Sequence, residues 1–280
     1  MGAVHGVYLK YVGLSALSYA GYATLTGDSP LEEALQLTRS LRESSSLAER
    51  ETLLSAGMSI FRLSSTCVLG YSAVLNGAVA VMFKLRRGMS LIGKCPQTGK
   101  IPMWSYVIYF PFHVPTYIYT HFHTKSGKNR KEGRKVPVAS EVQPGWWVGG
   151  CYANELNRDW SGVVDLTVEF PERCIDRCKN YLLLPTWDGV PANPAQLEEA
   201  AIFAVKAREG GDVVIHCAHG RGRSTTVMCA CLVKAGMFAT WQEAFEKGIK
   251  PGRPVCKLNS KMKKALTEWQ RDYVDGKKEV

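Results

Sequence analysis

A short apolar run at residues 213–215 leads without a break into a loop with two glycines, and the chain leaves this loop as a helix. A strand joined so directly to a helix is half of a β–α–β unit, which belongs in a largely parallel sheet. Three other apolar runs have strand length: residues 146–149, 162–166 and 181–184. We therefore predict an α/β fold for the second half of the chain, with a central, mostly parallel, twisted sheet flanked by helices.

The helices of this half carry recognisable start signals, namely capping residues, a proline at a first helical position and acidic residues one turn later. The expected first residues are Asn193, Ser224, Thr240 and either Asn259 or Ser260. Sheets of this kind bind ligands where strand ends meet helix starts. The loop at residues 216–222 is therefore the predicted position of the functional site.

The first half of the chain is unusually apolar. Residues 63–83 carry no charge, and this length is close to the roughly 20 residues that span a bilayer; Lys84 follows directly as a basic stop. Residues 101–119 form a second uncharged run, broken by Pro111 and Pro115, which indicates an interfacial or re-entrant segment. Residues 7–26 fit either a third membrane helix or a buried amphipathic one. The alternative is a small soluble helical domain whose apolar stretches pack on one another.

Basic side chains are concentrated between the two halves: Lys125, Lys128, Arg130, Lys131, Arg134 and Lys135. We interpret residues 125–137 as a basic linker, either a solvated connector or, at 125–135, a surface for anionic lipid headgroups. Despite the net charge of +10, nucleic acid is not an expected partner, because no base-stacking or groove-reading motif accompanies the charge. The predicted organisation is a helical, membrane-associated region at 1–124, the linker, and a catalytic domain at 138–280.

The charge distribution also predicts an orientation. Residues 29–50 form a predicted polar helix that is net acidic, whereas residues 84–100 and 125–135 are basic. If the basic stretches face the cytosol, the bias of cytoplasmic loops toward lysine and arginine is satisfied. We therefore expect a membrane-associated protein whose catalytic domain lies on the cytosolic side.

Cys217 stands where the strand ends and the helix begins, a position at which unpaired amides and the helix dipole favour negative charge. This field and the guanidinium of Arg223 lower a cysteine pKa, so we expect a nucleophilic thiolate at neutral pH. Arg223 also offers a planar fork to two phosphate oxygens. The residues between them predict a ring of amides around one tetrahedral oxyanion: Ala218, His219, Gly220, Arg221 and Gly222.

Four loop residues have expected supporting roles. Ser224 should hydrogen-bond the sulfur and make the thiolate a better leaving group when a phosphocysteine is hydrolysed. His216 should brace the loop from behind rather than act as a base, since it points away from the pocket. His219 and Arg221 add positive charge to the rim of the pocket, and His219 could narrow the pocket or titrate near neutrality.

The sequence His-Cys-x-x-Gly-x-x-Arg-Ser at 216–224 is the signature of the protein tyrosine phosphatase superfamily, and its short flanks resemble the dual-specificity branch. The resemblance extends from about residue 138 to residue 280, and residues 146–150 resemble the opening strand of that family. It implies hydrolysis of phosphate monoesters through a phosphocysteine intermediate. One departure is His219, which replaces the small residue that the family commonly has before the loop glycine.

The resemblance also implies a general acid, because the family supplies an aspartate from the loop that precedes its long helix. Residues 184–191 occupy that place, so the expected acid is Asp188, which would activate water in the second step. Two alternatives remain open at this point. Asp165 lies within or at the end of a predicted strand, and Asp176 lies in a charged stretch.

The nine cysteines are odd in number and show no disulfide framework, which favours a reducing compartment. No Cys-x-x-Cys pair occurs and no histidines stand at zinc-ligand spacing beside the cysteines, so we expect neither a metal site nor a cofactor. Cys229 and Cys231 are expected in the core. Cys174 and Cys178 could resolve an oxidised Cys217, although spacing alone does not establish their reach.

The sequence thus predicts a metal-independent phosphoric monoester hydrolase. Since the branch that it resembles acts on phosphotyrosine, phosphoserine and phosphothreonine, a dual-specificity protein phosphatase is the first expectation. Related branches act on phosphoinositides or phosphatidylglycerophosphate, and a basic linker at a membrane would bring the pocket to lipid headgroups. A phospholipid phosphatase is therefore the first alternative, and a phospho-binding pseudophosphatase or a membrane scaffold is the second.

Overall fold

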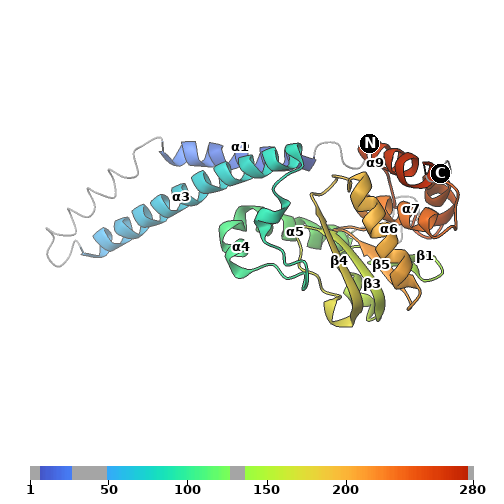
Figure 1. Ribbon diagram of the computed structural model, residues 1–280. Helices are drawn as coiled ribbons and strands as arrows, with labels where there is room; N and C mark the ends of the chain where they lie inside the picture. The colour runs from blue at the N-terminus through green and yellow to red at the C-terminus, as the bar shows by residue number, and fades with distance from the viewer. Residues whose placement is uncertain (1–6, 27–48, 127–135, 277–280) are drawn as a thin grey trace. The chain divides into compact units, whose positions relative to one another are not determined.

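The computed structural model describes residues 7–26, 49–126 and 136–276 (Figure 1). The chain forms two compact units, a smaller one at Tyr8–Lys84 and a larger one that contains Leu85–Val280. Most of the predicted polar helix at 29–50 and most of the basic linker lie outside the described residues, so those predictions stay predictions.

The smaller unit pairs two antiparallel helices, α1 (Val7–Thr26) and α3 (Glu49–Leu85). Ser15 donates a hydrogen bond of 2.7 Å to the carbonyl of Ala73, and the guanidinium of Arg62 donates to the carbonyl of Leu25 at 3.0 Å. Gly57–Leu85 is long and apolar enough to cross a membrane, by length and composition. It contains the predicted span at 63–83, whereas α1 does not meet the same criterion among the described helices.

The larger unit is built on one five-stranded sheet with the order β1-β2-β5-β3-β4. The strands are β1 (Ala139–Gln143), β2 (Trp146–Gly149), β3 (Trp160–Thr167), β4 (Cys178–Thr186) and β5 (Val213–His216). β1 pairs antiparallel with β2, and all other neighbours are parallel. The predicted α/β fold with a mostly parallel sheet is confirmed. β1 was not among the predicted strands.

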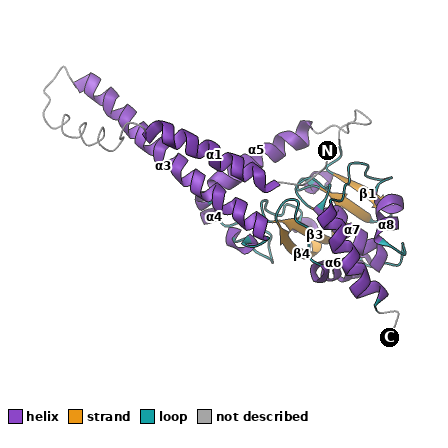
Figure 2. Ribbon diagram, turned by 90° about the horizontal axis from the view of Figure 1, so that it is seen from above, coloured by secondary structure: helices purple, strands orange, loops and turns teal. Residues whose placement is uncertain are grey.

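Helices cover the sheet, with α6 and α7 packed beside each other on it (Figure 2). They are α6 (Pro194–Arg208), α7 (Arg223–Lys234), the short α8 (Trp241–Glu243) and α9 (Ser260–Gln270). Three predicted start signals are confirmed, because the side chains of Asn193, Thr240 and Asn259 each accept a hydrogen bond from a first-turn amide. The helix expected at Ser224 begins one residue earlier, at Arg223, and has no side-chain cap. α7 is buried from Arg223 to Val233, which fixes the loop before it.

Residues 85–126 belong to the larger unit, so the unit boundary lies near residue 85 rather than at the predicted 124. They contain α4 (Met103–Ile108) and α5 (Phe110–Ser126), which includes Pro115. Phe112 is fully buried and meets Trp187 edge to face at 5.7 Å between ring centroids. The indole of Trp187 donates to the carbonyl of Arg87 at 2.8 Å. The predicted interfacial run at 101–119 therefore has one face that packs on the sheet domain, which hydropathy alone does not reveal.

Candidate active site

The loop between β5 and α7 is held open by bonds to its carbonyl groups. The carbonyl of Ala218 accepts from the Cys151 amide at 3.2 Å, and that of Arg221 accepts from the Lys257 amide at 2.8 Å. Arg253 binds two more carbonyls, those of Gly220 at 2.8 Å and His219 at 3.4 Å. Because four successive carbonyls are taken by the surrounding protein, the amides between them are left to face the sulfur and its ligand.

Glycine is required at one position of this loop. Gly220 has φ of +64°, and a Cβ atom there would lie 2.5 Å from the backbone of Gly149. Gly222 differs from the expectation, since its φ of −124° is accessible to other residues. A Cβ atom at Gly222 would instead meet the Met262 side chain at 3.0 Å. The tight approach of the loop to β2 therefore depends on Gly220.

Cys217 lies at the base of this ring and is 4% exposed. Burial raises the pKa of its thiol, but the charge of Arg223, the hydroxyl of Ser224 and two loop amides outweigh burial, so the pKa is lowered. The Ser224 hydroxyl lies 3.4 Å from the sulfur, as predicted from the sequence. The arrangement favours a thiolate held ready for attack on phosphorus.

We expect Cys217 to be alkylated by iodoacetate at pH values well below about 8.5, where an ordinary thiol is largely protonated. The thiolate fraction, and with it the alkylation rate, should fall only when the pH drops through the lowered pKa. The measurement is the rate of Cys217 carboxymethylation against pH by mass spectrometry, with glutathione as the reference thiol. A profile that coincides with that of glutathione would contradict the predicted thiolate.

Arg223 is fixed from behind by a residue that the sequence reasoning missed. Its Nη2 atom lies 2.6 Å from a carboxylate oxygen of Glu169, and its Nη1 atom donates to the carbonyl of Thr186 at 2.6 Å. Its Nε atom is buried and has no hydrogen-bond partner among the residues that the structure describes. An oriented guanidinium with a spare donor suits an incoming phosphate oxygen. Glu169 follows the end of β3, and an acidic residue at that sheet edge is the signal that could have found it.

Asp188 comes from the loop after β4 and reaches Arg223 at the start of α7. One of its carboxylate oxygens lies 3.4 Å from Nη2 of Arg223, and its side chain is 33% exposed. The buried Trp187 beside it anchors this loop. Of the other two candidates, Asp165 is fully buried in an ion pair and Asp176 is an exposed residue of a short helix, Ile175–Arg177. Among the three, the geometry therefore favours Asp188 as the proton donor.

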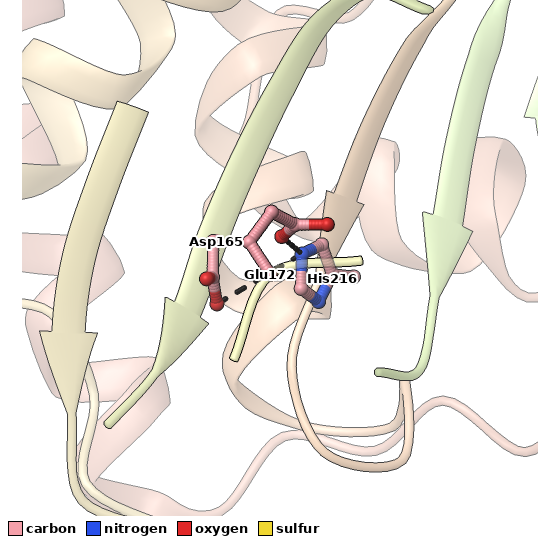
Figure 3. Close-up of side chains that lie close together, drawn as sticks. All are labelled: Asp165, Glu172 and His216. Atoms are coloured by element: carbon pink, nitrogen blue, oxygen red, sulfur yellow. Dashed lines mark hydrogen bonds and ion pairs between the residues drawn. The ribbon is translucent and has the colours of Figure 1, made fainter. Parts of the chain in front are cut away.

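His216 is braced from behind by two carboxylates, as Figure 3 shows. Its Nε2 atom lies 2.5 Å from Glu172 and 3.8 Å from Asp165. Burial alone would lower the pKa of His216, but these two carboxylates raise it to about 9, so the ring is cationic at neutral pH. Asp165 in turn pairs with the ammonium of Lys94. The spacing of Asp165, Glu172 and His216 could also bridge a metal ion, but Lys94 already supplies a cation there.

The rim of the site is partly formed by α5. The ring of His123 lies 4.6 Å from that of His219, and Tyr119 meets His219 edge to face at 5.8 Å. Burial lowers the pKa of His219 to about 4. His219 is therefore neutral at physiological pH, which differs from the expectation that it adds charge or titrates near neutrality. Arg221 still adds a positive charge to the rim, beside a hollow that Arg253 and Tyr152 also line.

Comparisons with known proteins found similar chains among solved structures. No family model and no curated protein matches the chain. The chain is similar to a mouse putative dual-specificity phosphatase complexed with zinc tungstate, with 23% identity, a TM-score of 0.45, and 50% of this chain and 91% of that one covered. It is similar to human DUSP28, with 22% identity and a TM-score of 0.41, and the match covers 48% of this chain and 94% of that one. It is also similar to PTPMT1 in complex with PI(5)P, with 20% identity and a TM-score of 0.43, and the match covers 50% of this chain and 99% of that one.

The sheet order, the position of Cys217 between a parallel strand and a buried helix, and the sequence at 216–224 agree with one another. The larger unit therefore has an α/β fold in which this sequence, which resembles the protein tyrosine phosphatase signature, joins β5 to α7.

Proposed function

We propose that this protein is a metal-independent phosphoric monoester hydrolase that works through a phosphocysteine on Cys217. The observation that carries the proposal is the ring of loop amides around Cys217, whose carbonyls are held outward by Cys151, Arg253 and Lys257. Fixed donors of this kind stabilise the equatorial charge of a phosphoryl group as it is transferred. The intact Cys217, Arg223 and Asp188 argue against a pseudophosphatase.

In the first step the Cys217 thiolate attacks phosphorus in line with the leaving oxygen. An S–P bond forms as the P–O bond breaks, and protonated Asp188 gives its proton to the departing oxygen. Arg223, oriented by Glu169, holds the phosphoryl oxygens throughout. The alcohol or phenol then leaves as a neutral molecule.

In the second step water attacks the phosphocysteine and the Asp188 carboxylate takes a proton from it. The S–P bond breaks, and inorganic phosphate forms as the sulfur leaves with its electron pair. The Ser224 hydroxyl, 3.4 Å from the sulfur, stabilises this thiolate. Both steps balance without a metal ion or a cofactor.

For the substrate we propose a phosphate monoester on a protein side chain or on a lipid headgroup. The dual-specificity protein phosphatase function rests on the signature sequence. A phospholipid phosphatase is the second candidate, because α5, whose His123 packs on His219 of the loop, also carries exposed apolar side chains. Membrane association is predicted from the sequence and is compatible with both candidates. It rests on the apolar helix at Gly57–Leu85.

The experiment that tests the proposed function is hydrolysis of aryl phosphates by the full chain with chelator and reductant. For a substrate with a poor leaving group, the Asp188→Asn variant should lose about 10²–10⁴-fold in kcat. For p-nitrophenyl phosphate the loss should be much smaller, because the departing p-nitrophenol oxygen needs little protonation. Asp176→Asn is the control and should behave as the wild type, since Asp176 is exposed and lies outside the site. Absence of wild-type hydrolysis across the acidic and neutral pH range would exclude the proposed reaction.

A further inference from the structure

The helices α4 and α5 carry an apolar surface that the larger unit leaves exposed. Its members are Met103, Trp104, Val107, Ile108, Val114, Ile118 and Phe122, which are between 46% and 75% exposed. On each helix they recur at the spacing of one face, as with Val114, Ile118 and Phe122. Single exposed apolar residues are ordinary, but a contiguous set marks a binding surface. We name this set the α4–α5 face.

The opposite side of α5 is occupied by the active-site domain. Phe112 packs on Trp187, the neighbour of Asp188, and His123 packs on His219 of the phosphate-binding loop. Residues 101–124 contain no charged side chain. A helix that is apolar on both sides needs a second apolar environment in addition to the protein core. Helix α5 therefore contacts this second apolar environment on one side and the rim of the site on the other.

The chain around these helices indicates a bilayer as the occupant. α3 is a candidate membrane span that ends at Leu85, where the larger unit begins, and Arg86 and Arg87 follow it directly. A membrane span at that end holds the larger unit near the surface, with the arginines at headgroup level. Trp104 and Tyr119 have the amphipathic rings that are enriched at membrane interfaces. Of the six basic residues at 125–135, Lys125 lies at the end of α5 and five follow it in the sequence, and their charge suits an anionic leaflet.

We propose that the α4–α5 face is an interfacial membrane-docking surface that places the phosphate-binding loop at the level of lipid headgroups. Because α5 contacts both His219 and the lipid in this arrangement, the rim of the site opens where headgroup phosphates lie. The preference for lipid-borne monoesters rests on the proposed phosphatase function, whereas the docking itself does not.

The first test reports docking independently of catalysis. The full chain with Cys217→Ser is reconstituted into phosphatidylcholine vesicles that contain phosphatidylserine, and tryptophan quenching by brominated phosphatidylcholine is measured. The fluorescence of Trp104 is obtained as the difference between this chain and one that also carries Trp104→Phe. The brominated lipid should strongly quench that difference. If Trp104 is instead quenched by aqueous acrylamide, or is shielded from acrylamide but not quenched by bromolipid, the face is exposed to water or covered by protein, and the proposal is wrong.

The second test reports the consequence for catalysis. Val107→Ser, Ile118→Ser and Phe122→Ser together should lower hydrolysis of phosphatidic acid in the same vesicles roughly tenfold or more, because apolar burial provides the docking energy. Ile202→Ser is the matched control, since Ile202 is 52% exposed on α6, away from this face. Soluble aryl phosphate hydrolysis confirms that the variants fold. Equal loss of vesicle and soluble activity, or no loss in vesicles, would overturn the proposal.

Discussion

The Cys217→Ser chain is expected to lose about 10⁴-fold or more in kcat toward every phosphate monoester, which is the scale seen when a covalent nucleophile is removed. A serine hydroxyl has no comparable anionic form at neutral pH, so the in-line attack has no nucleophile. The loop amides and the guanidinium of Arg223 remain, because their positions depend on Glu169, Arg253 and backbone contacts. Substrate binding should therefore persist while turnover disappears.

Rapid-quench labelling with ³²P substrate makes this result specific to Cys217. The wild type should form an acid-stable protein phosphate, and Cys217→Ser should not. Ser224→Ala should accumulate more of it, because the Ser224 hydroxyl assists departure of the sulfur. Cys95→Ser serves as the thiol control, since Cys95 lies in a turn before α4. Labelled Cys217→Ser, or full turnover by it, would contradict the phosphocysteine mechanism.

The Lys94→Met chain is expected to be less stable by about 3–5 kcal/mol, the usual cost of removing one partner of a buried ion pair. The side chains of Lys94 and Asp165 are 2% and 0% exposed, and Lys94 also donates to the carbonyl of Thr167 at 2.9 Å. Without the ammonium, Asp165 keeps only the charge of His216 at 3.8 Å. Burial would then raise the pKa of Asp165, which the ion pair holds at about 2.

Chemical unfolding followed by tryptophan fluorescence measures this loss. Adding Asp165→Asn to Lys94→Met should restore part of the stability, because the uncompensated charge is removed. Lys100→Met is the matched control on the same segment; Lys100 is exposed, so its change should stay within about 0.5 kcal/mol. If Lys94→Met unfolds like the Lys100 control, the buried pair does not stabilise the domain. The same contact joins the segment around Lys94 to strand β3 of the sheet.

The chemistry of the loop could be predicted because its determinants are adjacent in the chain. The strand, the turn glycine Gly220 and the helix of Arg223 all lie within one short segment. The expected positions of Cys217 and Ser224 follow from that local order. Strand β1 was missed because residues 139–143 are mixed in polarity and form an edge strand, which carries little periodic signal.

Other features of the site come from pairs that are distant in sequence. Glu169 is 54 residues from Arg223, and Lys94 is 71 residues from Asp165. The neutral state of His219 depends on burial against His123, which belongs to a helix that hydropathy assigned to the membrane region. Composition reports that such a helix is apolar, but it does not report what covers each side.

The sequence by itself therefore determined the class of fold and the place of Cys217 between a strand and a helix, because hydrogen bonding, glycine conformation and the helix dipole act over a few neighbouring residues. The tertiary structure alone decided which carboxylate orients Arg223, which cation neutralises Asp165, and that α5 forms part of the rim. Those outcomes depend on burial, where a charge needs a partner that only the folded chain can bring to it.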